Sequence, residues 1–364
     1  MKIDFANLTK AYLEHKDAID IAMSDVVSSS RFIMGKEVQD LEMQLQQYTG
    51  AKHAITCASG TDALILAMMA LDIKPGDEII TSPFTFIASA ETIAFLGAVP
   101  VFVDIDESTY NIDVNRIEEK ITEKTKAIMP ISLYGQVADM DAVNALAKKY
   151  DLAVIEDGAQ SFGATYKGKQ SCNLSTIGCT SFFPAKPLGC FGDGGAVFTN
   201  DEALSDKIKS IRVHGQTERY IHKYIGIGGR LDTLQAAILI EKLKYYDNDV
   251  ARRQKVAKKY NEHLINHTTI PFVEEYNTSV WAQYSIRIKD RNGVQLKLKE
   301  KGIPTAVHYP KPLHLQECFE YLEYKQGDFP VSENVSNEIM SLPMNPYLSD
   351  QEIQYITKEL KELL

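Results

Sequence analysis

The first two thirds of the chain alternate between short apolar runs and segments in which apolar residues recur at helical spacing. Strands that alternate with helices predict a parallel sheet covered by helices on both faces. The predicted strands are 54–57, 78–81, 99–103, 125–131, 152–156, 180–183 and 196–199, and the predicted helices between them are 38–48, 60–71, 89–96 and 141–149. The pattern therefore predicts an α/β fold.

The two ends of the chain differ from this pattern. Residues 1–30 form an N-terminal segment with an amphipathic helix near 12–28, and one long helix rich in Leu, Lys and Tyr is expected over 232–263. The remaining elements indicate a compact α+β unit, made of 281–288, a helix at 294–301, a strand at 304–308 and a helix at 349–363. At 364 residues the chain is long for one core. We expect a large domain, residues 1–245, and a smaller C-terminal domain, residues 246–364.

Composition and net charge argue against some classes of binding partner. The chain is 45% hydrophobic and 24% charged, with a formal net charge of −10, and no basic stripe offsets the negative charge. Nucleic acid and anionic membrane are therefore not expected as partners. The N-terminal stretch 1–5 shows no apolar run of the signal-peptide kind, and no later run approaches the length of a membrane span. The five cysteines are irregularly spaced and form no CxxC pair, which indicates reduced thiols in a cytoplasmic protein and no metal site.

One lysine lies where a charge is costly. Lys186 follows the apolar run 180–183 and stands between Pro184 and Pro187. An ammonium is expensive to bury, but a lysine that condenses with an aldehyde loses this charge. A lysine on a short loop in an apolar pocket is thus typical of Schiff-base enzymes. A surface lysine between two prolines is the alternative.

Two further stretches could bind a phosphorylated ring. Gly60 and Thr61 open the apolar helix 60–71, where bare backbone N–H groups favour a phosphate, although Ser59 could simply cap that helix. Asp157 ends a buried strand, and the carboxyl ends of parallel strands form the ligand crevice of an α/β sheet. Asp157 could hold a protonated pyridine nitrogen there, or it could be a solvated acid.

Two kinds of nucleotide-binding motif are incomplete in this sequence. The stretch 163–170 lacks the final Ser or Thr of a P-loop, and the glycine clusters 192–195 and 226–229 lack the G-x-G-x-x-G spacing. ATP and nicotinamide cofactors are therefore unsupported. Arg230 and the pair 308–309 could bind an anionic substrate, although each alone is more often structural.

Four blocks together resemble the DegT/DnrJ/EryC1/StrS family of sugar aminotransferases, which depend on pyridoxal 5'-phosphate (PLP). The blocks are 58–64, 155–163, 181–189 and 192–196. The resemblance spans nearly the whole chain. It implies aspartate-aminotransferase fold type I, with a mostly parallel central sheet in the large domain and a smaller α+β C-terminal domain.

The resemblance also implies roles for individual residues. Lys186 would bind the cofactor aldehyde and then move a proton between the donor carbon and the cofactor. Asp157 would keep the pyridine nitrogen protonated. A lysine rather than a histidine at this position favours transamination over sugar dehydration. The remaining cofactor contacts would be Gln160 to the phenolic oxygen, Phe86 to the ring face, and Gly60, Thr61 and Ser181 to the phosphate.

Two positions depart from the family pattern. Gly228 stands where the family usually has an asparagine that reaches the cofactor phosphate from the partner subunit. Ala185 replaces the Ser or Thr that commonly precedes the lysine. The first departure requires that the phosphate contact be supplied in another way.

A closer resemblance is to the subgroup that aminates the 3-keto form of UDP-N-acetylglucosaminuronic acid for O-antigen synthesis. It rests on stretches 131–136, 172–176, 230–235 and 305–310. A substrate with a diphosphate and a carboxylate would suit an anion-binding group. The implied substrate-binding residues are Phe32, Arg230, His308 and Tyr309, with Arg230 acting across a dimer interface.

These observations lead to one main hypothesis. The chain would move an amino group from L-glutamate to C3 of UDP-2-acetamido-2-deoxy-3-oxo-glucuronic acid, in a cytoplasmic homodimer with shared active sites. A 4-keto-nucleotide-sugar aminotransferase is the first alternative. A non-catalytic regulatory dimer of the same fold is the second, although a pure binder has no need of a buried lysine.

Overall fold

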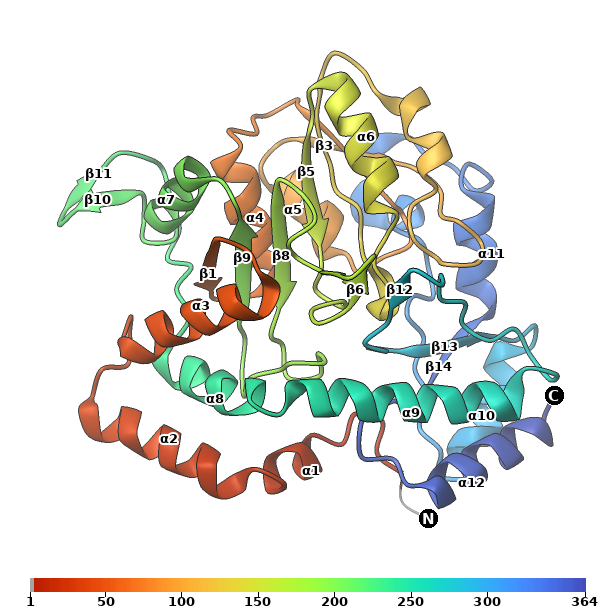
Figure 1. Cartoon of the computed structure of the whole chain (residues 1–364). Coiled ribbons are helices and arrows are strands. Elements are labelled where there is room, and N and C mark those ends of the chain that lie inside the picture. Colours follow the sequence, from red (N-terminus) through yellow and green to blue (C-terminus); the bar gives the residue numbers. More distant parts are fainter. Residues whose placement is uncertain (1–2) are drawn as a thin grey trace.

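A seven-stranded sheet lies at the centre of the larger part of the chain (Figure 1). The computed structural model describes residues 3–364. The strand order is β1-β9-β8-β5-β4-β2-β3; β9 runs antiparallel to both its neighbours and the other six strands are parallel. This confirms the predicted α/β fold with a mostly parallel sheet. The strands are β1 His53–Cys57, β2 Glu78–Thr81, β3 Val99–Phe102, β4 Thr125–Ile128, β5 Ala153–Asp157, β8 Ile177–Ser181 and β9 Gly195–Thr199.

Helices cover both faces of this sheet. Neighbouring strand residues point to opposite faces, so Ile79 and Ile155 pack in one buried cluster and Ile80 and Val154 in another. The first face is covered by α4 Gly60–Ala70, α5 Ala88–Phe95 and α7 Glu202–Ile211. The second face is covered by α3 Lys36–Thr49, α6 Met140–Tyr150 and α8 Thr233–Leu243.

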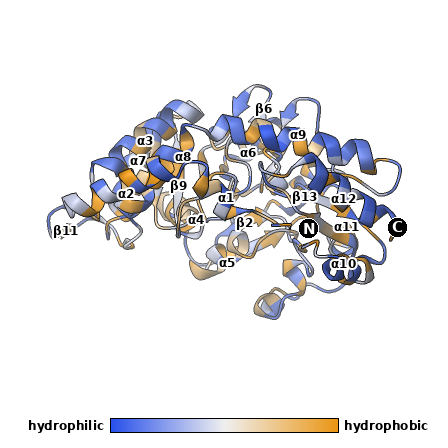
Figure 2. Cartoon of the chain, turned by 90° about the horizontal axis from the view of Figure 1, so that it is seen from below, coloured by the Kyte–Doolittle hydropathy of each residue, from blue (hydrophilic) through white to orange (hydrophobic). Residues whose placement is uncertain are grey.

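The hydropathy of these helices follows their burial. A helix that is apolar on nearly all sides must be buried, and α4 has six buried hydrophobic residues in its eleven. Figure 2 shows the region of α5 and β2 mostly in orange, whereas the outer helices α9 Tyr246–Leu264 and α12 Asp350–Lys361 are largely blue. Within residues 3–364, no helix is both long and apolar enough to cross a membrane.

A separate hydrophobic cluster gathers residues near the C-terminus. It joins one face of α9 to the antiparallel pair β13 Tyr284–Arg287 and β14 Ile339–Leu342, to α10 Arg291–Glu300 and to α12. Strand β12 Asn277–Thr278 instead pairs with β6 Thr165–Tyr166 of the larger part, next to β7 Lys169–Gln170. The expected domain boundary at residue 246 stays a prediction.

Two predicted helices are each broken in two. The chain forms α1 Leu8–Leu13 and α2 Lys16–Ser29 in place of one helix over 12–28, and α8 and α9 in place of one helix over 232–263. Both breaks have non-helical residues, His15 and Tyr245, and their rings stack with centroids 3.9 Å apart. This contact between distant segments fixes the breaks, and local sequence patterns do not contain it.

Two of the predicted strands also differ from what the structure shows. Residues 304–308 form a single bridge, Ala306 to Ser341, because Pro304 offers no N–H for a ladder. The strand expected over 180–183 ends at Ser181. The Phe182 N–H still donates to Gly194, the residue opposite it, at 2.7 Å, but its C=O accepts from the N–H of Cys190 at 2.8 Å, so the pairing ends there. The helices and strands absent from the predictions are α7, the β6–β7 pair, β12, a projecting hairpin of β10 Gln216–Glu218 and β11 Ile221–His222, α11 Pro330–Glu338 and β14. The 3-10 helices Val114–Arg116, Glu118–Lys120, Leu133–Gly135, Leu313–Leu315 and Glu317–Leu322 are also absent from the predictions.

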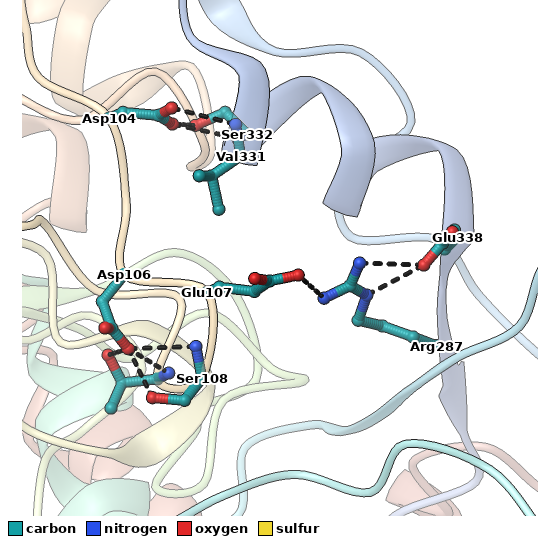
Figure 3. A network of polar contacts seen from close by, with 9 residues as sticks. Asp104, Asp106, Glu107, Ser108, Arg287, Val331, Ser332 and Glu338 are labelled. Carbon is teal, nitrogen blue, oxygen red and sulfur yellow. Dashed lines mark hydrogen bonds and ion pairs between the residues drawn. The ribbon is translucent and has the colours of Figure 1, made fainter.

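A polar network fixes α11 Pro330–Glu338 against the loop that follows β3 (Figure 3). The buried carboxylate of Asp104 accepts hydrogen bonds from the backbone N–H groups of Val331 and Ser332, both at 2.9 Å, and from the Ser332 hydroxyl. Arg287 of β13 pairs with Glu107 and with Glu338. The network ties the C-terminal cluster to the carboxyl edge of the parallel sheet.

Candidate active site

The loop that follows β8 carries Lys186. The backbone N–H of Lys186 donates to the carbonyl of Phe183 at 2.8 Å, which closes a tight turn. Gly189 ends the turn, and a Cβ there would lie 2.5 Å from the carbonyl oxygen of Pro184. Burial lowers the pKa of the Lys186 ammonium, although the carboxylate of Asp157 acts in the opposite direction. The loop therefore presents an amine that loses its proton more readily than a solvated lysine.

Asp157 lies at the end of β5, where the sequence placed it. Its buried carboxylate accepts a hydrogen bond from the Ser89 hydroxyl at 2.8 Å and one from the Ala159 N–H at 3.1 Å. Burial raises the pKa of Asp157, and the two hydrogen bonds and the nearby Lys186 partly offset this. A buried carboxylate held in this way favours a cationic N–H donor as its partner.

Glu156 points to the other side of β5, as strand alternation predicts. It is fully buried and accepts hydrogen bonds from the Ser171 hydroxyl at 2.7 Å and the Cys172 N–H at 2.9 Å. Burial raises the pKa of Glu156 to about 7. Of the two adjacent acids, only Asp157 faces the lysine.

Gln160 and Tyr309 close another side of the site. The Gln160 carbonyl accepts from the Tyr134 N–H at 2.8 Å, and its amide donates to the Tyr309 hydroxyl at 3.2 Å. The ring of Tyr309 lies 6.2 Å from the ring of Phe86, centroid to centroid. Burial raises the pKa of Tyr309, and the Asp157 carboxylate adds to this. These aromatic and amide groups thus surround the space next to Asp157.

His308 enters the site as a neutral ring. Its Nδ1 lies 2.8 Å from the Ser341 hydroxyl, and burial together with the charge of Lys186 lowers the pKa of His308 to about 4. Near neutral pH His308 therefore offers hydrogen bonds but no positive charge.

The N-terminus of α4 and the end of β8 form a cradle. The Ser59 hydroxyl caps α4 by accepting from the Asp62 N–H at 3.0 Å. A Cβ on Gly60 would lie 2.6 Å from the Cβ of Ser181 and 3.1 Å from its hydroxyl oxygen, so only glycine fits there. The first N–H groups of a helix have no intrahelical partner and bind anions well. Gly60, Thr61 and Ser181 together fit a phosphate.

The segments that carry Phe32 and Arg230 lie side by side, next to the start of α8. The carbonyl of Phe32 accepts from the N–H of Thr233 at 2.9 Å, and the carbonyl next to Arg230, that of Gly229, accepts from the N–H of Ala58 at 3.0 Å. Within the described chain, no hydrogen bond or ion pair links Arg230 to His308 or Tyr309.

Several neighbours of the site carry no sequence signal. Ser89 lies in an ordinary apolar helix, and Tyr134 is in a 3-10 helix with a positive φ of 57°. His214 lies beside the unusual Gly228, where a Cβ would come within 3.2 Å of its ring. Among residues 3–364, no group of three or more His, Cys, Asp or Glu side chains could hold a metal ion.

Comparison with known proteins identifies the family. Residues 14–361 match the DegT/DnrJ/EryC1/StrS aminotransferase family. The chain belongs to this family. It is 52% identical over 359 residues, 98% of this chain and 99% of the relative, to UDP-2-acetamido-2-deoxy-3-oxo-D-glucuronate aminotransferase of Pseudomonas aeruginosa. It is 45% identical over 366 residues, 100% of this chain and 98% of the relative, to a pleiotropic regulatory protein of Geobacillus stearothermophilus.

Solved structures agree with this assignment. DesV of S. venezuelae has a TM-score of 0.98 at 35% identity, with 100% of this chain and 98% of that chain covered. NtdA of Bacillus subtilis, solved with the bound cofactor PMP, has a TM-score of 0.93 at 30% identity, with 100% and 85% covered. The chain is thus a PLP-dependent nucleotide-sugar aminotransferase. The paired amine and carboxylate and the phosphate cradle fit that cofactor.

Proposed function

We propose that this aminotransferase moves an amino group from L-glutamate to C3 of UDP-2-acetamido-2-deoxy-3-oxo-glucuronic acid. The 52% identity to the Pseudomonas aeruginosa enzyme of that name, over nearly the full length of both chains, carries the choice of substrate. The product would serve O-antigen or other surface polysaccharide synthesis in the cytoplasm.

The catalytic roles fall to Lys186 and Asp157. Bound PLP supplies an electron sink for the negative charge that develops on the donor carbon. The Lys186 amine would hold the cofactor through its aldehyde and, once free, would take the proton from the donor carbon and give it to the C4′ carbon of the cofactor. The lowered pKa of Lys186 suits this task because the amine must be neutral to accept a proton. Asp157 holds the proton on the pyridine nitrogen.

The remaining groups orient the cofactor. Gln160, whose amide already reaches the Tyr309 hydroxyl, would donate to the phenolic oxygen. Phe86 would cover a ring face, and it is half exposed, which leaves that face free to be covered. The cradle of Gly60, Thr61 and Ser181 would hold the phosphate through hydrogen bonds and the positive helix end.

Substrate binding would use Phe32, Arg230, His308 and Tyr309 from two chains of a homodimer. Within the described residues of one chain no hydrogen bond or ion pair joins Arg230 to His308, and Arg230 would act on the partner's site. The diphosphate and carboxylate of the sugar nucleotide would pair with Arg230 as the charged group, whereas neutral His308 and Tyr309 would contribute hydrogen bonds.

The boundary of the two domains is part of this proposal. Residues 246–364 would form the small domain and residues 1–245 the large one, since α9 begins at Tyr246 and the second hydrophobic cluster is built almost entirely from residues after it.

A regulatory role is the second candidate, favoured by the 45% identity to the Geobacillus stearothermophilus regulatory protein. Lys186→Ala separates the two functions. Regulation by ligand binding should persist in this variant, whereas all amino transfer should be lost.

Substrate choice is tested with the purified protein, PLP and L-glutamate, offered either the 3-keto uronic acid or a 4-keto UDP-sugar. Mass spectrometry of the products should show an amino sugar from the 3-keto substrate and none in the Lys186→Ala control. Amination of only the 4-keto sugar would contradict the proposal and support the alternative substrate.

A further inference from the structure

The loop that carries Lys186 is fastened to the protein at two places. At its start, Phe182 is held by backbone hydrogen bonds to Gly194 and Cys190. At its end, two side chains of α8 reach the loop. The Lys242 ammonium donates to the carbonyl of Gly189, and the Gln235 carbonyl accepts from the N–H of Phe191 at 2.8 Å.

Lys242 is unusual because it has little else to bind. Among residues 3–364 no carboxylate pairs with its ammonium, which lies 5.7 Å from the ring centre of Phe191. Burial lowers the pKa of Lys242 to about 8; the charges of Cys190 and Asp249 raise it and that of Arg253 lowers it further. Lys242 is partly buried, and a partly buried ammonium without an ion-pair partner is costly. Its hydrogen bond to the loop carbonyl is the interaction that offsets this cost.

The loop between its two fastenings is anchored by one side chain, Leu188, which is buried in the same hydrophobic cluster as Phe182 and Cys190. Nearer to Lys186, its hydrogen bonds are the turn from the Lys186 N–H to the Phe183 carbonyl and a 3.2 Å bond from the Phe183 N–H to the Ser181 hydroxyl, and the side chain of Phe183 is 52% exposed. Gly189, next to the Pro184 carbonyl, admits no side chain that could anchor it. The position of Lys186 therefore depends both on Leu188 and on how firmly the end of the loop is held.

The same helix contacts the segment of the predicted substrate residues. At the N-terminus of α8, the Thr233 N–H donates to Phe32, and the Thr233 hydroxyl accepts from the Gly35 N–H at 3.1 Å. One helix thus contacts the lysine loop through Gln235 and Lys242 and the Phe32 segment through Thr233.

We propose that Lys242 and Gln235 are positioning residues that hold the end of the loop and thereby place the Lys186 amine for proton transfer. This inference rests on the proposed role of Lys186. A misplacement of a reacting group by about 1 Å can lower a rate by about a hundredfold. Loss of one fastening should therefore lower kcat more than it changes the KM for glutamate.

The test compares Lys242→Met, which keeps the apolar stem, with Lys242→Arg, which restores a donor. Lys244→Met is the matched control, since Lys244 lies just beyond the same helix end and makes an exposed pair with Glu241. Gln235→Leu removes the second contact with the loop end, the hydrogen bond to the Phe191 N–H. It provides the test if Lys242→Met does not fold. The readouts are kcat and KM, and hydrogen exchange of a peptide covering 182–192 in the cofactor-free protein.

We expect Lys242→Met and Gln235→Leu each to lower kcat about tenfold with KM within about twofold, and to speed exchange of this peptide. Lys242→Arg should recover much of the loss, and Lys244→Met should match the wild type. Variants that load PLP on Lys186 but match Lys244→Met in both readouts would overturn this inference alone. A wild-type protein that does not load PLP on Lys186 would overturn the proposed function with it.

Discussion

The hydroxyl of Ser89 donates a 2.8 Å hydrogen bond to Oδ2 of Asp157, and both groups are buried. Hydrogen bonds to a charged group contribute about 1.5–3 kcal/mol, so Ser89→Ala should raise the pKa of Asp157 further. A carboxyl that protonates more readily holds the pyridine nitrogen less well. We expect kcat to fall about tenfold near pH 7, with a larger loss at lower pH, measured as a pH–rate profile.

Thr92→Val is the control for this prediction. It removes a buried hydroxyl from the same helix, where Thr92 donates only to the Ala88 carbonyl. An equal loss of kcat in both variants, with no change in the pH profile, would show that Ser89 acts through helix stability and not through Asp157.

The buried Glu156 makes the stability of the protein depend on pH. Its pKa is raised from 4.5 to about 7, so the folded state binds a proton more tightly than the unfolded chain. Its contribution to stability is fully present below pH 4.5 and is lost as the pH rises through about 7. Glu156→Gln does not titrate. From about pH 5 to pH 8 the wild type should therefore lose stability relative to Glu156→Gln. The free energy of unfolding of the variant minus that of the wild type should rise by up to about 3 kcal/mol.

Denaturant unfolding of both proteins at several pH values measures this difference. Glu119→Gln, a change on an exposed acid, serves as the control and should show no such trend. A constant difference between wild type and Glu156→Gln across that pH range would contradict the prediction.

A partly buried ion pair supports the segment next to Arg230. Arg212 donates to Glu42 at 2.5 Å and to the Thr56 carbonyl at 2.7 Å, and its own carbonyl accepts from the Gly229 N–H. Glu42→Ala would leave the Arg212 charge buried without a partner. We expect a loss of about 3–5 kcal/mol in the free energy of unfolding.

The exposed pair Lys36–Asp40 lies on the same helix, α3, and provides the control. Asp40→Ala should cost about 0–1 kcal/mol. Chemical denaturation of the two variants compares them directly, and a similar small loss for Glu42→Ala would mean that water replaces the carboxylate.

The Asp104 carboxylate holds the first turn of α11 through three hydrogen bonds. Asp104→Ala would leave buried donors on Val331 and Ser332 unpaired, at a cost of about 1–3 kcal/mol. Differential scanning calorimetry should show a lower Tm. Glu107→Ala removes only the exposed partner of Arg287, which keeps Glu338, and should change the Tm much less. Equal shifts would mean that Asp104 does not fasten α11.

The main features of the fold follow from local patterns. Period-two and helical spacing predict the order of the seven central strands and of helices α3 to α6, and Asp157 indeed ends β5. Patterns within one segment cannot show the stacking of His15 on Tyr245, which breaks two helices. They also cannot show the short β6–β12 pairing, whose partners lie more than a hundred residues apart in the chain.

The residues of the active site also divide into those that the local sequence indicates and those that only the folded structure shows. Lys186 and Asp157 could be singled out because a lysine or an acid at the end of an apolar strand is chemically unusual. Ser89 and Lys242 lie in helices with ordinary patterns, and their relevance comes from contacts that only folding creates. Sequence alone could not show that His308 is neutral, because burial sets its pKa.

The central claim is that Lys186 binds the aldehyde of PLP. The direct measurement is borohydride reduction of the purified protein with PLP, followed by digestion and mass spectrometry of the peptide that contains Lys186. The account predicts a phosphopyridoxyl group on Lys186, which is absent when L-glutamate is added before reduction and absent in Lys186→Ala. A label on another lysine, or none, would contradict it.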